Sequence, residues 1–247
     1  MARETVKLLG GEVMARGFIM SEQQSLFGPC DVVGFGDEGF FVKEIKRDEA
    51  NEIVMKRHYS KKFYNASYIH LGIFLHGKVM GVMQYGYAMN PASAGSVVAG
   101  TGIKEYLELN RMWLDDDCPR NSESQAISFS IKFIKRKYPR IKWIQSFADE
   151  RCGGFGIVYQ ACSFSYYGEH DSVFWELDGV TYHNSLMTRD PSLSKSAAHL
   201  IANKDRALPS VLRQFRYIKF IDAREKKKCT LKECAYPKHY IKGTGAK

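Results

Sequence analysis

Two stretches of the chain carry apolar residues at the spacing of an α-helix. In residues 48–57 an apolar stripe follows Asp48, which is placed to cap the helix. The stripe in residues 122–138 is longer, and one face holds Ala126, Ile127, Ile131, Phe133 and Ile134. This stretch ends in basic residues before Pro139, which cannot continue a helix. The pattern therefore predicts two helices, of which the second is the better defined.

Apolar runs of strand length surround these helices. Residues 71–75 and 79–85 flank His76-Gly77-Lys78, and Gly77 accommodates the positive φ of a tight hairpin turn. Further strands are predicted over residues 104–114, 142–148, 164–167 and 173–177, with a brief helix over residues 154–161. Residues 1–39 are expected to form loops with one short strand. This order predicts an α/β fold in which helices flank a mixed, mostly antiparallel sheet.

From residue 192 onward the pattern becomes basic and helical. It culminates in the run Arg224-Glu225-Lys226-Lys227-Lys228. We therefore expect a catalytic domain over residues 1–190. A basic helical C-terminal extension over residues 191–247 is expected to pack on it.

The charge balance points to a polyanionic partner. The 247 residues include 36 Lys and Arg against 27 Asp and Glu, which gives a formal net charge of +9. Such an excess favours nucleic acid as a partner. No run reaches the roughly 20 apolar residues needed to cross a membrane, and residues 1–17 do not read as a secretory signal. Six cysteines do not predict a disulfide framework, so we expect a cytoplasmic protein without membrane contact.

Two polar residues stand out in the first half of the chain. His58 is a candidate base or ligand, because its ring titrates near neutral pH; alternatively, it complements the dipole of a solvated helix end. Arg111 lies within a predicted strand, where a charged side chain needs a partner. It either holds an anion or a carbonyl oxygen, or it forms a structural ion pair with Glu108 or Asp149.

A third candidate follows the strand over residues 142–148. Asp149 ends this strand before a glycine-rich turn and a helix, a common position for functional groups in open α/β sheets. Asp149 is placed to accept a proton from an amine, and Tyr159 to donate one; alternatively, the glycines only tighten a turn. Cys229, Cys234 and His239 have only a loose metal-ligand spacing, and the missing second pair argues against zinc.

Five motifs taken together resemble the Mom family of phage DNA-modification proteins, over about residues 48–189. They are Arg-His58-Tyr59-Ser, Glu-Leu-Asn-Arg111-Met-Trp, Ser-Glu-Ser124-Gln, Phe-Ala-Asp149-Glu-Arg-Cys-Gly-Gly-Phe-Gly and Val-Tyr159-Gln. The resemblance implies an acetyltransferase-like (GNAT) fold. It also implies conversion of the exocyclic N6 amine of adenine in DNA to its carbamoylmethyl derivative. This product protects phage DNA from restriction in the cytoplasm of the infected bacterial host.

The same resemblance assigns residues to the site. The implied catalytic residues are His58, Tyr59, Arg111, Ser124, Asp149 and Tyr159. Acetyl-CoA is the implied donor, with Met112, Trp113, Arg120, Ser122 and Ser124 as its contacts. An iron ion held by His58, Tyr59 and Asp149 is also implied, and a homodimer is compatible with the resemblance.

Two arguments leave the donor open. The turn over residues 115–121 holds three aspartates, a single cation and no glycine, unlike the Gly-rich basic loop that such folds use for pyrophosphate. Acyl transfer from acetyl-CoA would also give N–CO–CH3, whereas the implied product is N–CH2–CO–NH2. A glycyl donor such as glycyl-tRNA supplies these atoms without a redox step, and tRNA would then be a second partner. In that scheme Asp149 is the base, Arg111 stabilises the oxyanion and Tyr159 relays a proton.

A DNA substrate requires base extrusion and phosphate contacts, because the reacting amine is not accessible within a duplex. Phe63, Tyr64, Tyr166 and Tyr167 are candidates to stack on the base, with core packing as the alternative. The predicted phosphate contacts are Lys61, Lys62, Arg206, Arg213, Arg216, Lys219, Lys226, Lys227 and Lys228. The competing functions are a small-molecule or protein N-acetyltransferase and a DNA-binding protein without catalysis.

Overall fold

The structure is a computed structural model that describes residues 6–8, 12–21, 31–152 and 154–237. The chain divides into two compact units that interleave in sequence. The first unit comprises Met1–Ser146, Val158–Ser165 and Ile218–Lys232, and the second comprises Phe147–Ile157, Tyr166–Tyr217 and Glu233–Lys247. The boundary expected at residue 190 therefore lies inside the second unit.

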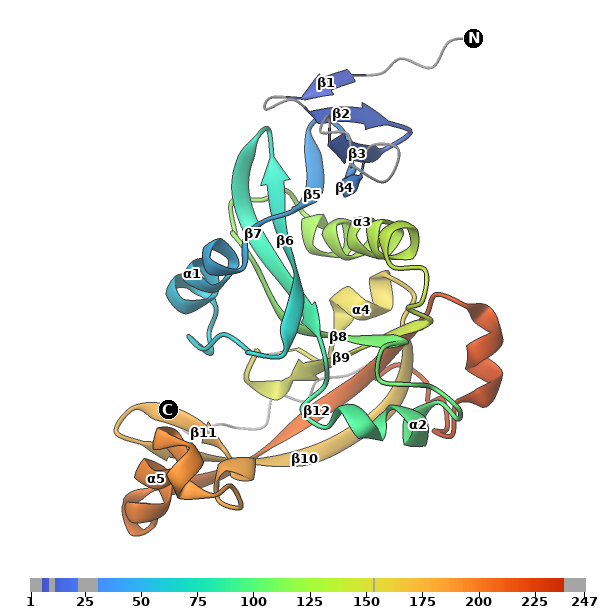
Figure 1. Cartoon of the computed structure of the whole chain (residues 1–247). Helices are drawn as coiled ribbons and strands as arrows, with labels where there is room; N and C mark the ends of the chain where they lie inside the picture. Colours follow the sequence, from blue (N-terminus) through green and yellow to red (C-terminus); the bar gives the residue numbers. More distant parts are fainter. Residues whose placement is uncertain (1–5, 9–11, 22–30, 153, 238–247) are drawn as a thin grey trace. The chain divides into compact units, whose positions relative to one another are not determined.

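The sheet of the first unit follows the chain order from β1 to β9 (Figure 1). Its strands are β1 (Val6–Leu8), β2 (Glu12–Ala15), β3 (Phe18–Ser21), β4 (Val32–Gly36), β5 (Phe40–Glu44), β6 (Ser67–Leu75), β7 (Lys78–Gly86), β8 (Tyr106–Leu114) and β9 (Trp143–Asp149). Neighbouring strands are antiparallel from β1 to β8, whereas β8 and β9 are parallel. The predicted mixed, mostly antiparallel sheet with helices is thus confirmed.

The expectation of loops with one short strand before Gly39 is wrong, because β1 to β4 form there. Alternate residues of β4 are buried, as expected for a strand with one face on the core. Phe35 of β4 makes an edge-to-face contact with Phe129 of α3 (Ser122–Lys137), with ring centroids 5.4 Å apart. Glycines at positions 34 and 36 obscured this strand in the sequence.

The hairpin and the two long helices form close to their predicted positions. At the β6–β7 turn, His76 and Gly77 have φ values of 48° and 79°, the left-handed pair that a tight hairpin requires. Helix α1 (Arg47–Arg57) has Lys46 at its N-cap position without a side-chain cap hydrogen bond, so the prediction of Asp48 as the cap is wrong; Asp48 lies in the first turn near the positive end of the helix dipole. Figure 1 shows α1 and α3 on opposite sides of β6 and β7.

Shorter elements complete the described chain. The short helices are α2 (Ala94–Val97), within a segment rich in Gly, Ala and Ser, and α4 (Ile157–Ala161). The 3-10 turns are η1 (Pro91–Ser93), η2 (Glu150–Cys152), η3 (Asn184–Leu186), η4 (Pro191–Leu193), η5 (Lys204–Arg206) and η6 (Ala223–Lys228). The segment carrying η6 returns to the first unit, where the Ile221 and Asp222 amides donate to the Lys142 carbonyl.

The second unit is built on β10 (Ser165–Leu177), β11 (Val180–His183) and β12 (Leu208–Phe220), with helix α5 (Lys195–Ala202). The two strands predicted over residues 164–177 are one continuous strand. The expected helical character of the C-terminal extension is wrong for Leu208–Phe220. There, buried Phe215 and Tyr217 alternate with half-buried Arg216, which is the two-residue period of a strand.

Candidate functional site

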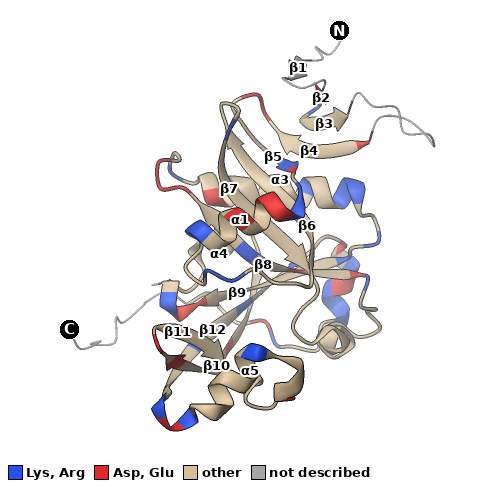
Figure 2. Ribbon diagram, turned by 60° about the vertical axis from the view of Figure 1, so that its left-hand side comes forward, with Lys and Arg blue, Asp and Glu red and all other residues tan. Residues whose placement is uncertain are grey.

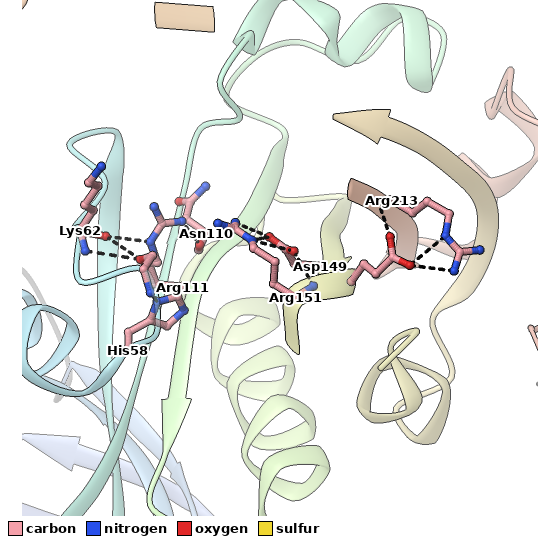
Figure 3. A network of polar contacts seen from close by, with 9 residues as sticks. His58, Lys62, Asn110, Arg111, Asp149, Arg151 and Arg213 are labelled. Atoms are coloured by element: carbon pink, nitrogen blue, oxygen red, sulfur yellow. Dashed lines mark hydrogen bonds and ion pairs between the residues drawn. The ribbon is translucent and has the colours of Figure 1, made fainter. Parts of the chain in front are cut away.

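Arg111 connects the middle of the first unit's sheet to the loop that follows α1 (Figure 3). In the β7–β8 ladder Gln84 pairs with Arg111 and Tyr85 with Leu109, so Asn110 forms a β-bulge between them. The Arg111 Nε donates to the Lys62 carbonyl oxygen at 2.9 Å, and Nη1 donates to the Asn110 carbonyl oxygen at 2.6 Å. The bulge thus aims the guanidinium at a loop, and in these two contacts it binds backbone carbonyl oxygens.

His58 is held in one tautomer by the same loop. It is buried, at 5% exposure, and its Nδ1 accepts the Ser60 backbone N–H at 3.1 Å. The Ser60 hydroxyl also lies 2.8 Å from Nδ1. Because a backbone amide can only donate, Nδ1 carries a lone pair and the neutral ring carries its proton on Nε2. His58 is therefore arranged as a hydrogen-bond donor at Nε2.

The loop between α1 and β6 presents aromatic rings among cations. Tyr59 is 53% exposed and Phe63 is 45% exposed, while Lys61 and Lys62 are exposed beside them. Tyr59 also packs on the His58 ring, with centroids 4.3 Å apart. Aromatic faces interleaved with lysines are the pattern that binds unpaired nucleotides through stacking and phosphate contacts.

The other stacking candidates differ in exposure. Tyr64 and Tyr167 are half-buried. Tyr166 is buried, and its ring lies 5.2 Å from that of Tyr217 in the second unit. The core-packing alternative therefore applies to Tyr166, whereas Phe63 is presented to solvent.

A cluster of hydrogen-bonding side chains joins β8 and β9. Glu108 and Gln145 are directly paired in the parallel register, so both side chains lie on the same face of the sheet. Gln145 Nε2 donates to Glu108 Oε2 at 2.7 Å, and Asn110 Nδ2 lies 3.3 Å from Glu108 Oε1. Gln145 is 4% exposed, and its Oε1 has no hydrogen-bond partner.

Tyr159 is hydrogen-bonded within the first unit. Ser146, which is buried, places its Oγ 2.8 Å from Tyr159 Oη and 3.3 Å from the Leu109 carbonyl oxygen. A serine hydroxyl has one proton. If Ser146 donates it to Leu109, Tyr159 must donate to Ser146, which makes a short chain from the phenol to the β8 backbone. The predicted proton-relay role of Tyr159 stays a prediction.

The residues predicted to contact acetyl-CoA are engaged in the fold. Trp113 packs against the core cluster of Ala50, Val54 and Val82, and Ser122 is buried. Ser124 donates to the Asn121 carbonyl oxygen at 2.9 Å, so its hydroxyl closes the first turn of α3.

Met112 is paired with Met83 in the β7–β8 register, and Arg120 is exposed in the turn before α3. In that turn, Asp115 accepts the Asp117 amide at 3.1 Å. Three acidic side chains next to one cation do not form a cradle for a pyrophosphate. These residues therefore do not fit the pyrophosphate of coenzyme A.

Asp149 belongs to the second unit and is bound by Arg151. Its carboxylate accepts from the Arg151 backbone amide at 3.0 Å, from Nε at 3.0 Å, and from Nη2 at 2.5 Å (Figure 3). Arg151 also lies over the Phe174 ring, 4.3 Å from its centroid. Three donors on one carboxylate leave limited capacity for a metal ion.

The implied iron site is not reproduced by the described residues. Among them, no group of three His, Cys, Asp or Glu side chains is arranged to hold a metal ion. In the neutral tautomer of His58 the only ring lone pair is on Nδ1, where it already accepts from the Ser60 amide. Asp149 is engaged by Arg151 as described above. His239, the third residue of the loose cysteine–histidine pattern, lies outside the described residues.

Several residues predicted to contact phosphates are in ion pairs or hydrogen bonds within their units. Arg213 binds Glu150 through Nη2 at 2.9 Å, and this contact lowers the pKa of Glu150. Arg206 binds Asp178 at 2.6 Å, and Lys228 binds Glu225 at 2.9 Å.

The other residues predicted to contact phosphates bind neutral groups or are exposed. Lys219 and Lys226 donate to backbone or hydroxyl oxygens, and Arg216 lies over the Phe147 ring. Lys61, Lys62 and Lys227 are exposed. Figure 2 shows both cations (blue) and acids (red) in several helices and loops of the ribbon.

Comparison with known proteins identifies the family. The sequence profile of the Mom protein family matches residues 39–238. The chain belongs to the Mom protein family. A curated relative, the methylcarbamoylase mom of Escherichia phage Mu, is 44% identical over 225 residues, which cover 88% of this chain and 93% of the relative. Membership of the Mom family makes the chain a transferase, as predicted.

Solved structures similar to this Mom-family chain are acetyltransferases. The ribosomal-protein-S5-alanine acetyltransferase from Vibrio fischeri is 13% identical, with a TM-score of 0.46 over 77% of this chain and 98% of that structure. An acetyl transferase of Salmonella typhimurium that modifies ribosomal protein L7/L12 is 11% identical, with a TM-score of 0.44 over 75% and 97%. These similarities are too weak to carry an argument about ligands.

Gln145 and Arg151 are not among the site residues predicted from the sequence. Gln145 lies in an apolar run and resembles an ordinary strand residue until the structure pairs it with Glu108. Arg151 follows Asp149 by two residues, and this spacing was the available signal.

Among the described residues, none of the helices has the length and apolar character that a membrane span requires.

Proposed function

We propose that this chain converts the exocyclic N6 amine of adenine in DNA to the carbamoylmethyl derivative and thereby protects phage DNA from restriction. The observation that carries the proposal is the similarity to the phage Mu methylcarbamoylase, which extends over 88% of this chain. The net charge of +9 suits a nucleic-acid substrate. A small-molecule or protein N-acetyltransferase is the alternative, and it treats that charge as incidental.

The loop between α1 and β6 is the proposed contact for the extruded adenine. Phe63 and Tyr59 offer exposed aromatic faces, and Lys61 and Lys62 lie beside them to meet the flanking phosphates. Arg111 holds this loop through the Lys62 carbonyl, so it acts as a positioning residue. Because Nδ1 of His58 accepts from Ser60, the proton of the neutral ring lies on Nε2.

The donor is proposed to be an activated glycine, carried as glycyl-tRNA. In the first step the adenine N6 attacks the glycyl ester carbonyl, which forms the amide and releases the tRNA 3′-hydroxyl. The glycyl amine then attacks ring carbon C6 and forms a five-membered spiro intermediate. Cleavage of the original C6–N6 bond opens this ring and leaves C6–NH–CH2–CO–NH2. Atoms and electrons balance, and no oxidant or metal is consumed.

Acetyl-CoA is the competing donor, since an acetyltransferase-like fold implies it. Its methyl carbon would have to bond to nitrogen, and an additional nitrogen would have to be supplied. The turn over residues 115–121, with its three aspartates, also argues against a pyrophosphate at α3. For these reasons we favour glycine as the source of both carbons.

Asp149, Tyr159 and Ser124 keep their proposed catalytic roles from the family resemblance. Asp149 is proposed to receive the proton of the attacking amine, and its contacts with Arg151 orient the carboxylate for this. Tyr159 is proposed to relay a proton through its hydrogen bond with Ser146.

Mass spectrometry of nucleosides from cells that express the chain tests the activity. Adenine heavier by C2H3NO, absent with an Asp149→Ala variant of equal expression and folding, is the expected result. Unmodified adenine with both proteins would favour the N-acetyltransferase alternative. Binding to DNA without modification, and without dependence on Asp149 or Arg111, would favour the third function, a DNA-binding protein that is not an enzyme.

Nitrogen labelling tests the donor. With 15N at the adenine amine, the label should appear in the carboxamide nitrogen of the product. Label that remains on the nitrogen attached to the ring would exclude the rearrangement.

A further inference from the structure

Gln145 is a buried side chain whose carbonyl oxygen is unsatisfied. It is 4% exposed, and Oε1 has no hydrogen-bond partner. The amide orientation is fixed, because Nε2 donates to the Glu108 carboxylate at 2.7 Å and the reverse orientation would bring two acceptors together. A buried unsatisfied acceptor is costly, and such atoms occur where a ligand or water supplies the donor.

Glu108 places a carboxylate beside the Gln145 amide. Within the first unit, Oε2 accepts from Gln145 and Oε1 from Asn110. Because Glu108 and Gln145 are paired in the parallel register, the carboxylate and the unsatisfied carbonyl lie side by side on one face. An acceptor pair of this kind, with one negative charge, matches a group that carries several N–H donors and a positive charge.

We propose that Gln145 and Glu108 form a binding site for the primary amine of the group donor. The site explains why a glutamine carbonyl is buried without a partner, since the ammonium of the ligand supplies the missing donor. A glycyl group carries such an amine, whereas an acetyl group has none. The inference rests on the proposed function for the identity of the donor, and it makes Gln145 a specificity-determining residue.

The first unit contains a natural control. Gln84 on β7 is also buried and also has an unsatisfied Oε1. Its Nε2 donates to Asn51 at 2.9 Å and lies 3.2 Å from His70 Nδ1, so no carboxylate stands beside it in these contacts. Replacement of either glutamine by methionine removes a similar amide from a similar environment. Only the Gln145→Met variant should lose recognition of an amine.

Equilibrium binding of two small probes to the full chain tests the site. Glycinamide has a free amine, and N-acetylglycinamide has that amine blocked. The wild-type chain should bind glycinamide about tenfold or more tightly than the blocked probe, as expected for charge-assisted hydrogen bonds. The Gln145→Met variant should lose this preference, whereas Gln84→Met should keep it. Glu108→Gln, which removes the charge, should also weaken binding of glycinamide.

Equal binding of both probes by the wild-type chain would overturn the proposal. A preference that survives in Gln145→Met would do the same, and circular dichroism of each variant verifies that it is folded. A separate assay keeps this inference distinct from the proposed donor. If the amine preference is present but glycyl-tRNA is not consumed, the binding site stands and the proposed donor fails. If glycyl-tRNA is consumed without any amine preference, the proposed donor stands and the binding site fails.

Discussion

Arg111 on β8 donates from Nε to the carbonyl oxygen of Lys62 at 2.9 Å, across 49 positions of sequence. The same guanidinium donates from Nη1 to the Asn110 carbonyl at 2.6 Å. A strand in the middle of the sheet thereby fixes the loop that carries His58, Tyr59 and Phe63. The planar fork of an arginine is suited to this, because two donors at fixed angles define the position of the loop.

The Arg111→Lys variant should therefore fail despite its retained charge. A lysine has one nitrogen and cannot bond both carbonyls in the same geometry, so adenine modification should fall about tenfold or more. Hydrogen exchange of the amides in residues 58–64 should rise in parallel. Unchanged exchange together with lost activity would assign Arg111 a direct role in the chemistry instead. The measurements are nucleoside mass spectrometry and exchange mass spectrometry.

Phe63→Ala should lower binding to DNA that contains an extruded adenine analogue. Loss of one stacking ring is expected to weaken binding by about 5- to 100-fold, whereas Phe63→Tyr should retain binding. Fluorescence of 2-aminopurine placed opposite an abasic site reports the stacking directly. Ile103→Ala is the matched control, because Ile103 has a similar exposure of 46% against 45% for Phe63. Equal effects of the two alanine variants would remove the stacking role.

Removal of metals should leave the activity intact. His58 has its Nδ1 occupied by Ser60, and Asp149 accepts three donors from Arg151, so neither is arranged as an iron ligand. Protein treated with a strong chelator and verified by elemental analysis should modify adenine at the rate of untreated protein. A loss of activity that iron alone restores would contradict this prediction.

Stability should decrease in weak acid because of His70. Burial, and secondly the charge of Arg47, lower the pKa of His70 from its ordinary value of 6.5. The folded state therefore favours the neutral ring. Its contribution is fully present above pH 6.5 and is lost as the pH falls below that value, where the unfolded chain takes up the proton first.

Urea denaturation at several pH values checks this prediction. The free energy of unfolding of a His70→Gln variant should depend less steeply on pH below 6.5 than that of the wild type. His76→Asn, at an exposed position in the hairpin turn, is the control. Equal slopes for the wild type and His70→Gln would show that His70 does not contribute.

Exposed lysines should set the salt dependence of DNA binding. Removal of one phosphate contact is expected to reduce the slope of log affinity against log salt by about 0.9. Lys61→Ala and Lys227→Ala should each show such a reduction in a filter-binding or anisotropy titration. Lys56→Ala provides the comparison, since Lys56 is already paired with Glu52 at 2.5 Å on α1. An equally large reduction of the salt slope in Lys56→Ala would indicate a general effect of net charge.

Local signals made part of the fold predictable. Helix α3 has strong periodicity and the β6–β7 hairpin has clear turn chemistry, so the ends of both agree with the prediction to within one residue except the start of β6, which lies four residues earlier. Strand β12 was predicted as helical because it stands in a basic segment, although Phe215 and Tyr217 flank Arg216 with the alternation of a strand. Strands β1 to β4 were missed because they are only three to five residues long, and such short segments become strands only when neighbours complete their hydrogen bonds.

The candidate site, like the fold, was predictable only in part. The motifs around His58, Arg111 and Asp149 could be proposed as site segments, because charged residues at strand and helix ends are visible in a sequence. The contacts themselves were beyond reach, since Arg111 binds a backbone carbonyl and any residue type could provide one. The unsatisfied oxygen of Gln145 depends on the β8–β9 register, which no local pattern determines.

The first unit includes Ile218–Lys232, which bonds to the Lys142 carbonyl and the Val97 carbonyl. During synthesis on the ribosome, that segment emerges only after residues 1–217 have been translated. The unit that carries Arg111 and Tyr159 therefore cannot complete its hydrogen bonding while the chain is still short. A premature stop codon anywhere before Ile218 would consequently leave an unfinished protein rather than a smaller enzyme.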